Sequence, residues 1–413
     1  MTMPPLKRSP LLTIAEARAA VIAGARPVEG EEAVPLALSR GRILARDLAS
    51  PRALPVFDHS AMDGYAIALA PDAARYTLVG RVVAGQALSA RLSPGEAVRI
   101  FTGAPLPAGA DAVAMQENVA TENGAITLTQ TLRAGDNIRR AGEDVAIGDA
   151  LVPAGSVIDA RHIGLAAAVG LATLPVRRKA RVALVSTGDE LVESGGALAP
   201  GQIYDSNRPM LAAALERPAL ELVDFGALRD DRATISAFFS RVAPDFDLVI
   251  TTGGASVGDE DHIAAALAVA GGSIDVARVA IRPGKPFTHG RLAGASIAIL
   301  PGNPFAAFIA ALLFTRPMIE RALGLPASDF EPLPARAGFA QPRTRERTEF
   351  APARVAGLDG NGTPIIERLG RGGSARLQPL IGADGLAVIA PGETPVAAGD
   401  PIGYLPFGAA FSL

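Results

Sequence analysis

The chain has 413 residues, more than one hydrophobic core usually supports, and 49% of them are hydrophobic, so we expect several well-packed domains rather than a disordered chain. Its net charge of −3, with no basic run longer than Arg177-Arg178-Lys179, argues against nucleic-acid binding. Cysteine is absent, which excludes disulfides, iron–sulfur clusters and thiol catalysis, and the four histidines are scattered, so any metal must be held mainly by oxygen, which favours Mg²⁺.

The amino-terminal segment gives no sign of export or membrane insertion. Residues 1–14 lack the long apolar core of a signal peptide. The most apolar helical segment, Phe305–Phe314, is far shorter than the roughly 20 residues that cross a bilayer. We therefore expect a cytoplasmic protein without membrane contact.

The first half of the chain predicts one helix followed by short strands. The helix is expected over residues 10–23, with Thr13 as its N-cap and Glu16 completing a capping box. A strand and a helical turn follow in 33–48, and a strand and a small helix in 150–176. Between them, β-type runs alternate with proline and glycine, which predicts a β-rich module. These runs are Tyr76–Val83, Ala97–Phe101, Ala112–Gln116 and Ala125–Thr131.

From Ala180 onward, apolar strands alternate with helices, which predicts a central doubly wound, mostly parallel α/β domain. The expected strands are Arg181–Ser186, Leu220–Phe225, Phe246–Thr251, Val276–Ile281 and Ser296–Leu300. The expected helices are Ser206–Arg217, Asp231–Val242, Asp259–Ala270 and Pro304–Leu323. After Pro326 a proline-rich stretch leads to short strands that indicate a small C-terminal β-barrel or sandwich. These strands are Thr348–Val355, Pro364–Glu367, Gly385–Ile389 and Pro401–Pro406.

A glycine-rich loop, Thr251 to Asp259, joins a buried strand to a helix. Its glycines let backbone N–H groups approach a ligand, and the N-terminus of the following helix favours negative charge. Open α/β sheets bind ligands beyond the carboxyl ends of their strands. We interpret the loop as an anion site formed by Gly253, Gly254 and Gly258; the plainer alternative is a connecting turn.

A second loop, Ser186 to Glu190, also follows a strand. The adjacent carboxylates Asp189 and Glu190 suit Mg²⁺ coordination or phosphate-linked chemistry. The alternative is an aspartate that caps a helix on a surface turn.

Two proline-containing loops follow later strands. In the segment from Arg282 to Phe287, two prolines around a glycine predict a rigid loop that projects Arg282 and Lys285. These two cations can neutralise an oxyanion such as phosphate. The alternative is a solvated loop with ordinary basic residues. The segment from Leu300 to Pro304 places Asn303 as the N-cap and Pro304 as the first residue of the last helix. A ligand role there would be additional.

Nine motifs occur in order over nearly the whole chain: FDHSAMDGYA, TGAPLP, GADAVAMQE, RRAGEDV, STGDEL, GQIYDSN, TTGGASVGDEDH, RPGKPF and LPGNP. Composition alone predicts only that the first motif is a loop. Taken by itself, His59 is expected to form a hydrogen bond within that loop rather than to act as a catalytic base. Together, the motifs resemble those of the molybdopterin molybdenumtransferases, MoeA-type proteins related to the gephyrin E domain. The middle α/β domain alone also resembles molybdopterin adenylyltransferases.

The resemblance implies a reaction and an architecture. With Mg²⁺, such enzymes cleave the phosphoanhydride of adenylyl-molybdopterin, release AMP and place molybdate on the dithiolene. They are elongated homodimers of four domains, with the active site between the α/β domain of one subunit and the β-rich domain of the other. A transient contact with molybdopterin adenylyltransferase is a further expectation. The corresponding domains here are 7–26 with 178–328 (α/β, molybdopterin-binding type), 27–48 with 149–177 (linking), 49–148 (β-rich) and 329–413 (C-terminal β-barrel).

The resemblance also assigns individual residues. The catalytic set is Asp63, Thr102 and Asp144 from one subunit with Glu190, Asp230 and Asp261 from the other. Substrate or oxyanion binding falls to the glycine loop with Ser256, Arg278, Arg282, Lys285, Pro301, Pro304 and Ser374. Mg²⁺ would be held by Asp189, Glu190 and Asp261. In this scheme Arg282 and Lys285 hold molybdate or the terminal phosphate, while Asp63 and Asp144 orient the pterin or the molybdate.

The chain departs from the family pattern at four positions. Arg278 and Arg282 stand where members often carry lysine, so a planar fork replaces a point charge; oxyanion binding should survive with a different geometry. Ala255 and His262 stand where valine and tyrosine are common, and we expect neither change to remove function.

Two other functions are compatible with these motifs. A molybdopterin adenylyltransferase would consume ATP, but that reaction needs only the α/β domain, so the extra β modules argue against it. A non-catalytic scaffold is allowed by the gephyrin relationship, but every acidic motif position is present. Molybdate and tungstate are both open as the oxyanion.

Overall fold

The structure, a computed structural model, describes residues 11–86, 91–254 and 262–408. By its internal contacts the chain divides into two units. Unit 1 comprises 1–32, 41–43 and 177–413, and unit 2 comprises 33–40 and 44–176. In the ranges that the structure describes, no helix is long and apolar enough to cross a bilayer.

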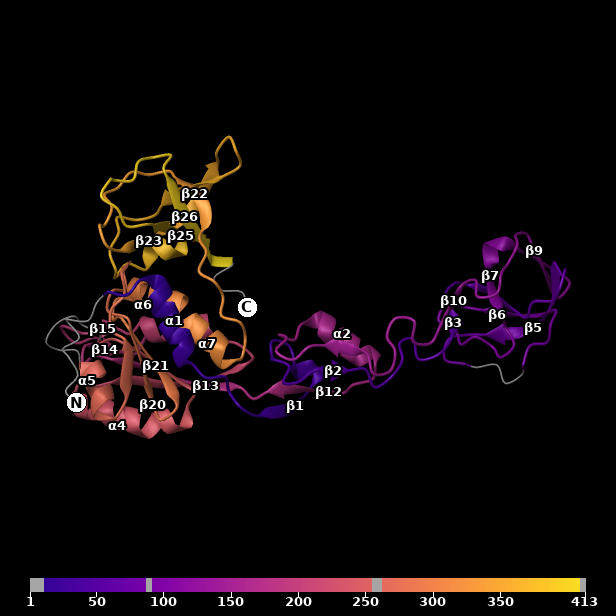
Figure 1. Cartoon of the computed structure of the whole chain (residues 1–413), viewed down its shortest axis with the longest axis horizontal. Helices are drawn as coiled ribbons and strands as arrows, with labels where there is room; N and C mark the ends of the chain where they lie inside the picture. The colour runs from indigo at the N-terminus through magenta and orange to yellow at the C-terminus, as the bar shows by residue number, and fades with distance from the viewer. Residues whose placement is uncertain (1–10, 87–90, 255–261, 409–413) are drawn as a thin grey trace. The chain divides into compact units, whose positions relative to one another are not determined.

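A six-stranded sheet forms the centre of the α/β part of unit 1, in the order β16-β13-β17-β21-β20-β18 (Figure 1). The first four strands run parallel, whereas β20 is antiparallel to both of its neighbours. The predicted mostly parallel sheet is therefore confirmed. The strands are β13 (Ala180–Thr187), β16 (Leu220–Leu228), β17 (Leu248–Thr252), β18 (Ser273–Val276), β20 (Thr288–Leu292) and β21 (Ala295–Leu300). A separate short pair is β14 (Leu191–Val192) with β15 (Ile203–Tyr204).

The strand predicted over Val276–Ile281 is wrong. Strand β18 ends at Val276, and β19 (Ile281–Arg282) pairs with β23 of the C-terminal region instead. The intervening backbone binds Leu12, which directly precedes the N-cap of α1: Ala280 N–H donates to the Leu12 carbonyl at 2.8 Å, and Val279 forms a bridge with Leu12. The apolar run Val276–Ile281 thus connects the α/β sheet to the C-terminal sheet instead of forming one continuous strand.

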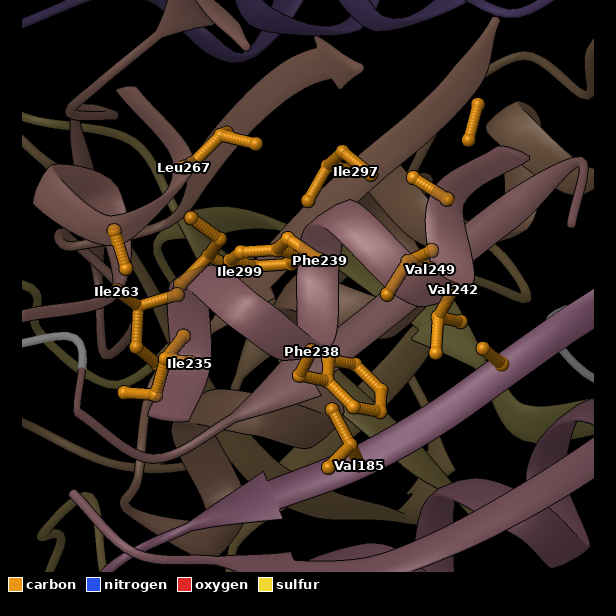
Figure 2. Packing of buried hydrophobic residues seen from close by; sticks show 14 of the residues in the cluster. Val185, Ile235, Phe238, Phe239, Val242, Val249, Ile263, Leu267, Ile297 and Ile299 are labelled. Carbon is orange, nitrogen blue, oxygen red and sulfur yellow. The ribbon is translucent and has the colours of Figure 1, made fainter. Parts of the chain in front are cut away.

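Helices cover both faces of the sheet, as expected for a doubly wound domain (Figure 1). Because side chains alternate along a strand, Ala183 and Val185 of β13 face α4 and α5, where Phe239 lies at the centre of the cluster shown in Figure 2. The other face carries α1, α3, α6 and α7. The helices are α1 (Ile14–Gly24), α3 (Asn207–Leu215), α4 (Arg232–Val242), α5 (His262–Val269), α6 (Pro304–Ala310) and α7 (Arg316–Ala322), with a π-helical segment (Ala311–Thr315) between the last two.

Three of the predicted helix starts have different outcomes. The capping box of α1 is confirmed: Thr13 Oγ1 accepts from Glu16 N–H at 3.2 Å, and Glu16 Oε2 accepts from Thr13 N–H at 2.8 Å. Asp231, the residue at which this helix was expected to begin, is the N-cap of α4 and accepts from Thr234 N–H. Asn303 occupies the N-cap position of α6, but its side chain makes no capping bond. The N–H of Phe305 donates instead to the Ser374 carbonyl at 3.0 Å.

The C-terminal part of unit 1 is a closed five-stranded barrel, which decides between the barrel and the sandwich. Its strands close in the order β23-β24-β22-β26-β25 and back to β23. They are β22 (Leu333–Ala337), β23 (Thr348–Leu358), β24 (Pro364–Arg368), β25 (Gly385–Ile389) and β26 (Pro401–Pro406), with the short helix α8 (Gln378–Ile381) before β25. Strand β22 was not predicted because it lies in the proline-rich stretch.

Unit 2 contains two structured parts. In the first, α2 (Ala160–Ala168) packs over short strand pairs around a core that includes Leu44, Leu174 and Val176. These pairs are β1 (Glu31–Pro35) with β12 (Thr173–Arg177), at the border with unit 1, and β2 (Leu48–Ala49) with β11 (Ala150–Val152). The second part is a six-stranded sheet in the order β7-β4-β6-β5-β9-β8, which confirms the β-rich module. Its strands are β4 (Gly64–Ile67), β5 (Arg75–Val82), β6 (Glu96–Ile100), β7 (Ala112–Met115), β8 (Val119–Glu122) and β9 (Ala125–Leu128), beside the pair β3 (His59–Ser60) and β10 (Ile138–Arg139).

Candidate functional site

A pocket of about 480 Å³ opens at the carboxyl ends of β13, β17 and β21. This is the edge at which open parallel sheets bind ligands. The polar groups of its wall come from the ends of two strands and from the start of two helices. The lining includes Ser186, Thr187, Glu190, Asn207, Thr252, Gly253, Gly254, Gly302, Pro304 and Ala375.

Gly253 and Gly254 follow β17 with positive φ values of 101° and 56°. A Cβ added at Gly253 would lie 2.1 Å from the Thr187 carbonyl oxygen. A Cβ at Gly254 would lie 2.9 Å from Ile263 Cδ1. Close backbone approach therefore requires glycine at position 253, whereas at position 254 an added Cβ would meet only side-chain atoms and the positive φ favours glycine. Ser256, Gly258 and Asp261, which belong to the same motif, lie outside the described residues.

The two carboxylates that follow β13, Asp189 and Glu190, lie in different environments. Glu190 lines the pocket, with its carboxylate over Gly188, where an added Cβ would lie 2.6 Å from Oε2. Asp189 is two-thirds exposed, and its Oδ1 accepts from the backbone N–H of Asp230 at 3.3 Å. Asp230 thus lies beside Asp189. Within the described residues, no three His, Asp or Glu side chains converge as a metal site.

Cations gather around the loop that follows β19. The Arg282 side chain is half-exposed, and its Nη1 lies 3.7 Å from Glu349 Oε2. The pKa of Lys285 is lowered, first by partial burial and then by the nearby positive charges of Arg278 and Arg347. Like charges held this close create a positive potential that suits an anion.

The start of α6 and a loop of the C-terminal barrel place Pro304 in the pocket wall and Pro301 and Ser374 next to residues that line it. Pro304 lines it as the first helical residue, and the Pro301 carbonyl accepts from Thr252 Oγ1 at 3.1 Å. The Ser374 carbonyl accepts from Phe305 N–H, and Ala375 lines the pocket. A loop of the C-terminal barrel is therefore part of the wall.

The motif GQIYDSN holds a pocket residue that our sequence analysis did not single out. Asn207 is 6% exposed, and its Nδ2 donates to Thr252 Oγ1 at 2.8 Å and to the Gly302 carbonyl at 2.7 Å. These two bonds tie α3 to the ends of two strands. In the sequence, Asn207 could have been recognised from the run of small polar residues at the start of a helix beside the sheet edge.

Behind Asn207, a buried charged pair supports the same wall. Asp205 is 3% exposed, accepts from Ser186 Oγ at 2.5 Å and pairs with Arg208 Nε at 3.1 Å. Burial opposes the charge of Arg208, but hydrogen bonds to Asp224 and Asp205 outweigh it and raise its pKa. The pair thus fixes the segment that carries Asn207.

In unit 2, Asp63 and Thr102 are brought together. Asp63 Oδ1 accepts from both the N–H and the hydroxyl of Thr102, each at 2.8 Å. The backbone bond is the larger cause of the lowered pKa of Asp63, followed by the hydroxyl bond. The result is an exposed, oriented carboxylate that is ionised at neutral pH.

Asp144 lies in the loop after β10, which pairs with β3. Asp58 holds this loop: its carboxylate accepts from Arg140 Nη1 at 2.6 Å and from Ala141 N–H at 2.8 Å, and these bonds lower its pKa. Asp144 itself is exposed, and its N–H donates to the Leu54 carbonyl at 3.0 Å. The segments that carry Asp63 and Asp144 are therefore joined through strand pairing and Asp58.

Three family regions match the chain in order. Residues 12–170 match the MoeA N-terminal region (domain I and II), 183–321 a probable molybdopterin binding domain, and 334–407 the MoeA C-terminal region (domain IV). Among curated relatives, molybdopterin molybdenumtransferase 2 of Mycobacterium tuberculosis is 39% identical over 71% of this chain and 75% of its own length. The Nostoc molybdopterin molybdenumtransferase is 34% identical over 90% of this chain and 87% of its own length.

The chain belongs to the molybdopterin molybdenumtransferase family. The family resemblance of the nine motifs is thereby confirmed. A crystal structure of a molybdopterin biosynthesis MoeA protein from Pyrococcus horikoshii agrees, with a TM-score of 0.81 and 31% identity, covering 96% of this chain and 99% of that one. A second structure of a MoeA protein from Pyrococcus horikoshii OT3 has a TM-score of 0.78 at 25% identity and covers 96% of this chain and all of the other.

Proposed function

We propose that this chain transfers molybdate to adenylyl-molybdopterin in the cytoplasm, releasing AMP and forming the molybdenum cofactor. Membership of the family gives molybdenum insertion as the activity. The observation that carries the finer proposal is the pocket at the carboxyl ends of β13, β17 and β21, whose glycine turn and Glu190 suit a phosphate-bearing ligand. Arg282 and Lys285 of the same unit supply positive charge for the oxyanion.

Mg²⁺ is part of the proposal, held by Asp189 and Glu190 together with Asp261. The donor set fits, because Mg²⁺ prefers oxygen ligands, keeps several waters and needs only one or two carboxylates beside substrate phosphates. Among the described residues, the Glu190 carboxylate forms no hydrogen bond or ion pair and faces the pocket. When bound, the ion supplies charge neutralisation for the phosphate oxygens.

We further propose that the enzyme acts as a homodimer with residues of both subunits in each active site. The family residues are divided between two units: Asp63, Thr102 and Asp144 in unit 2, the others in unit 1. Asp63 would orient the pterin or the molybdate through its fixed carboxylate, and Asp144 would assist. A transient contact with molybdopterin adenylyltransferase would deliver the substrate.

The test is AMP release from adenylyl-molybdopterin with molybdate and Mg²⁺. Glu190→Gln should slow release at least about tenfold and raise the Mg²⁺ concentration needed for half-maximal rate, since a neutral amide binds the cation weakly. Glu216→Gln, an exposed glutamate after α3, is the matched control and should turn over normally. Unimpaired turnover by Glu190→Gln would refute the metal role.

The two alternatives make different predictions. An adenylyltransferase would form pyrophosphate from molybdopterin and Mg-ATP, whereas the proposed enzyme forms none. A scaffold would fold and dimerise yet fail to restore molybdoenzyme activity to cells that lack the insertion enzyme. Restoration by the wild-type chain, and its loss with Glu190→Gln, would support catalysis.

A further inference from the structure

Arginine and aromatic side chains alternate on one face of the six-stranded sheet of unit 2. Tyr65 of β4 and Arg81 of β5 are both direct cross-strand neighbours of Arg99 on β6. Arg99 lies over the Tyr65 ring at 5.0 Å and over the Phe101 ring at 4.9 Å, and Arg81 covers the Phe101 ring at 4.7 Å. We call these four residues the arginine ladder. Each of the two guanidinium groups therefore lies over at least one aromatic ring.

Neither arginine of the ladder forms an ion pair with a carboxylate among the described residues. Arg99 donates to two neutral acceptors, the Gly64 carbonyl at 3.1 Å and Gln116 Oε1 at 2.6 Å. Arg81 is exposed and makes no hydrogen bond or ion pair in the described part of the chain. The N–H groups of Arg81 are therefore available to bind an anion in the plane of the guanidinium.

The ladder borders the carboxylate that the proposed function uses. Phe101 directly precedes Thr102, which binds Asp63, and Arg99 binds the carbonyl of Gly64, which directly follows Asp63. Arg99 also contributes to the lowered pKa of Asp63. The opposite face of these strands is core, with Val98 and Ile100 fully buried. The face that carries the ladder is also core further along the sheet, where Tyr65 packs against a cluster that includes Ala97. The ladder is therefore the partly exposed end of this face, with Arg81 exposed, and it lies beside a fixed carboxylate.

We propose that the arginine ladder binds the adenylate part of the substrate. Flat rings stack on arginine and aromatic faces, and a guanidinium can hold a phosphate in its own plane while its face stacks. The base would lie against Arg81 and Phe101, and the in-plane N–H groups of Arg81 would hold the phosphate. This inference rests on the proposed function, since that function supplies an adenylate.

The test is equilibrium binding of AMP to the full-length chain by calorimetry, with no turnover required. Arg81→Ala should weaken AMP binding about tenfold, the factor that corresponds to about 1.4 kcal/mol. Arg81→Lys keeps the positive charge but loses the planar guanidinium, so its affinity for AMP should lie between those of the wild type and Arg81→Ala. Arg75→Ala is the matched control: it removes another exposed arginine of β5 and should bind AMP as the wild type does.

The ligand series separates stacking from charge. Ribose 5-phosphate, which lacks the base, should bind at least about tenfold more weakly than AMP to the wild type. Phe101→Leu should remove that preference while the thermal transition of the chain shows that it still folds. Equal AMP affinity in Arg81→Ala, Phe101→Leu and wild type would overturn the ladder as a subsite, and so would the absence of AMP binding to the wild type.

Failure of the ladder and failure of the proposed function give different results. If the wild type releases AMP from adenylyl-molybdopterin but ladder variants bind AMP normally, the insertion function stands and the subsite is refuted. If AMP binding depends on the ladder but no insertion occurs, the nucleotide site stands and the proposed reaction is refuted.

Discussion

Thr102 donates two hydrogen bonds, from its backbone N–H and its hydroxyl, to the same oxygen of Asp63, each at 2.8 Å. Hydrogen bonds to the charged form of a carboxyl favour ionisation, which explains the lowered pKa of Asp63. The side chain also becomes fixed in direction, because the backbone donor belongs to the turn that follows β6. A surface aspartate is thereby held ionised and oriented.

Replacing the hydroxyl should therefore raise the pKa of Asp63. Thr102→Val removes the side-chain donor but leaves the backbone donor, so the pKa should move up towards its ordinary value without reaching it. Thr102→Ser keeps the hydroxyl and should leave the pKa close to that of the wild type. Carboxyl-carbon NMR titration measures both, and an unchanged pKa in Thr102→Val would assign the whole shift to the backbone bond.

Local patterns in the sequence predicted the elements whose partners are also local or strongly apolar. Thr13 and Glu16 are three residues apart, so the capping box is visible without any tertiary information. Strand β17 and, from Val182 onward, strand β13 are continuous runs of buried residues, which only a sheet covered on both faces accommodates. The sequence therefore predicted where the pocket lies, at the carboxyl ends of these two strands, which Glu190 and Gly253 follow.

The remaining features depend on contacts between residues far apart in the chain. Val279 left the expected strand because its backbone pairs with Leu12. The N–H of Phe305 is satisfied by Ser374, so the Asn303 side chain does not cap α6. Asn207 binds Gly302 across the pocket. None of these partners is marked by spacing or composition, and each became visible only with the tertiary structure.

The glycine turn after β17 should tolerate no side chain. At Gly253 a Cβ would lie 2.1 Å from the Thr187 carbonyl oxygen, whereas Gly271, with a similar positive φ of 89°, has open space around it. Gly271→Ala should lose only the cost of a left-handed backbone, about 1–2 kcal/mol. Gly253→Ala must also displace a strand end and should lose about 4 kcal/mol or more. Urea unfolding compares the two, and equal losses would contradict the clash.

Two substitutions at N-cap positions should differ in how much they lower the free energy of unfolding, although their sequence contexts are similar. Thr13→Ala removes a side-chain acceptor for the first turn of α1 and should lower the free energy of unfolding by about 1 kcal/mol. Asn303→Ala removes a side chain that makes no capping bond, so stability should change by less than about 0.5 kcal/mol. Thermal unfolding under matched conditions measures both. A larger loss for Asn303→Ala would mean that its side chain caps α6 in solution.

His289 should make unit 1 sensitive to mild acid. The side chain is fully buried on β20, neither ring nitrogen has a hydrogen-bond partner among the described residues, and burial lowers its pKa to about 4. Above its ordinary pKa of 6.5 the ring is neutral whether the chain is folded or unfolded. Between pH 6.5 and 4 only the unfolded chain takes up the proton, so stability falls as pH falls. The loss between pH 7 and pH 5 should be about 2 kcal/mol.

Two substitutions separate this effect from general acid destabilisation. His289→Gln removes the titrating ring, so unfolding free energies measured in urea at pH 7 and pH 5 should differ by about 2 kcal/mol less than in the wild type. Asp275→Asn removes the carboxylate that lies 3.5 Å from His289 Nδ1 and favours its protonation. Because that change lowers the pKa of the folded His289 further, Asp275→Asn should steepen the pH dependence near pH 4. An identical pH dependence in the wild type and His289→Gln would show that another group carries the acid sensitivity.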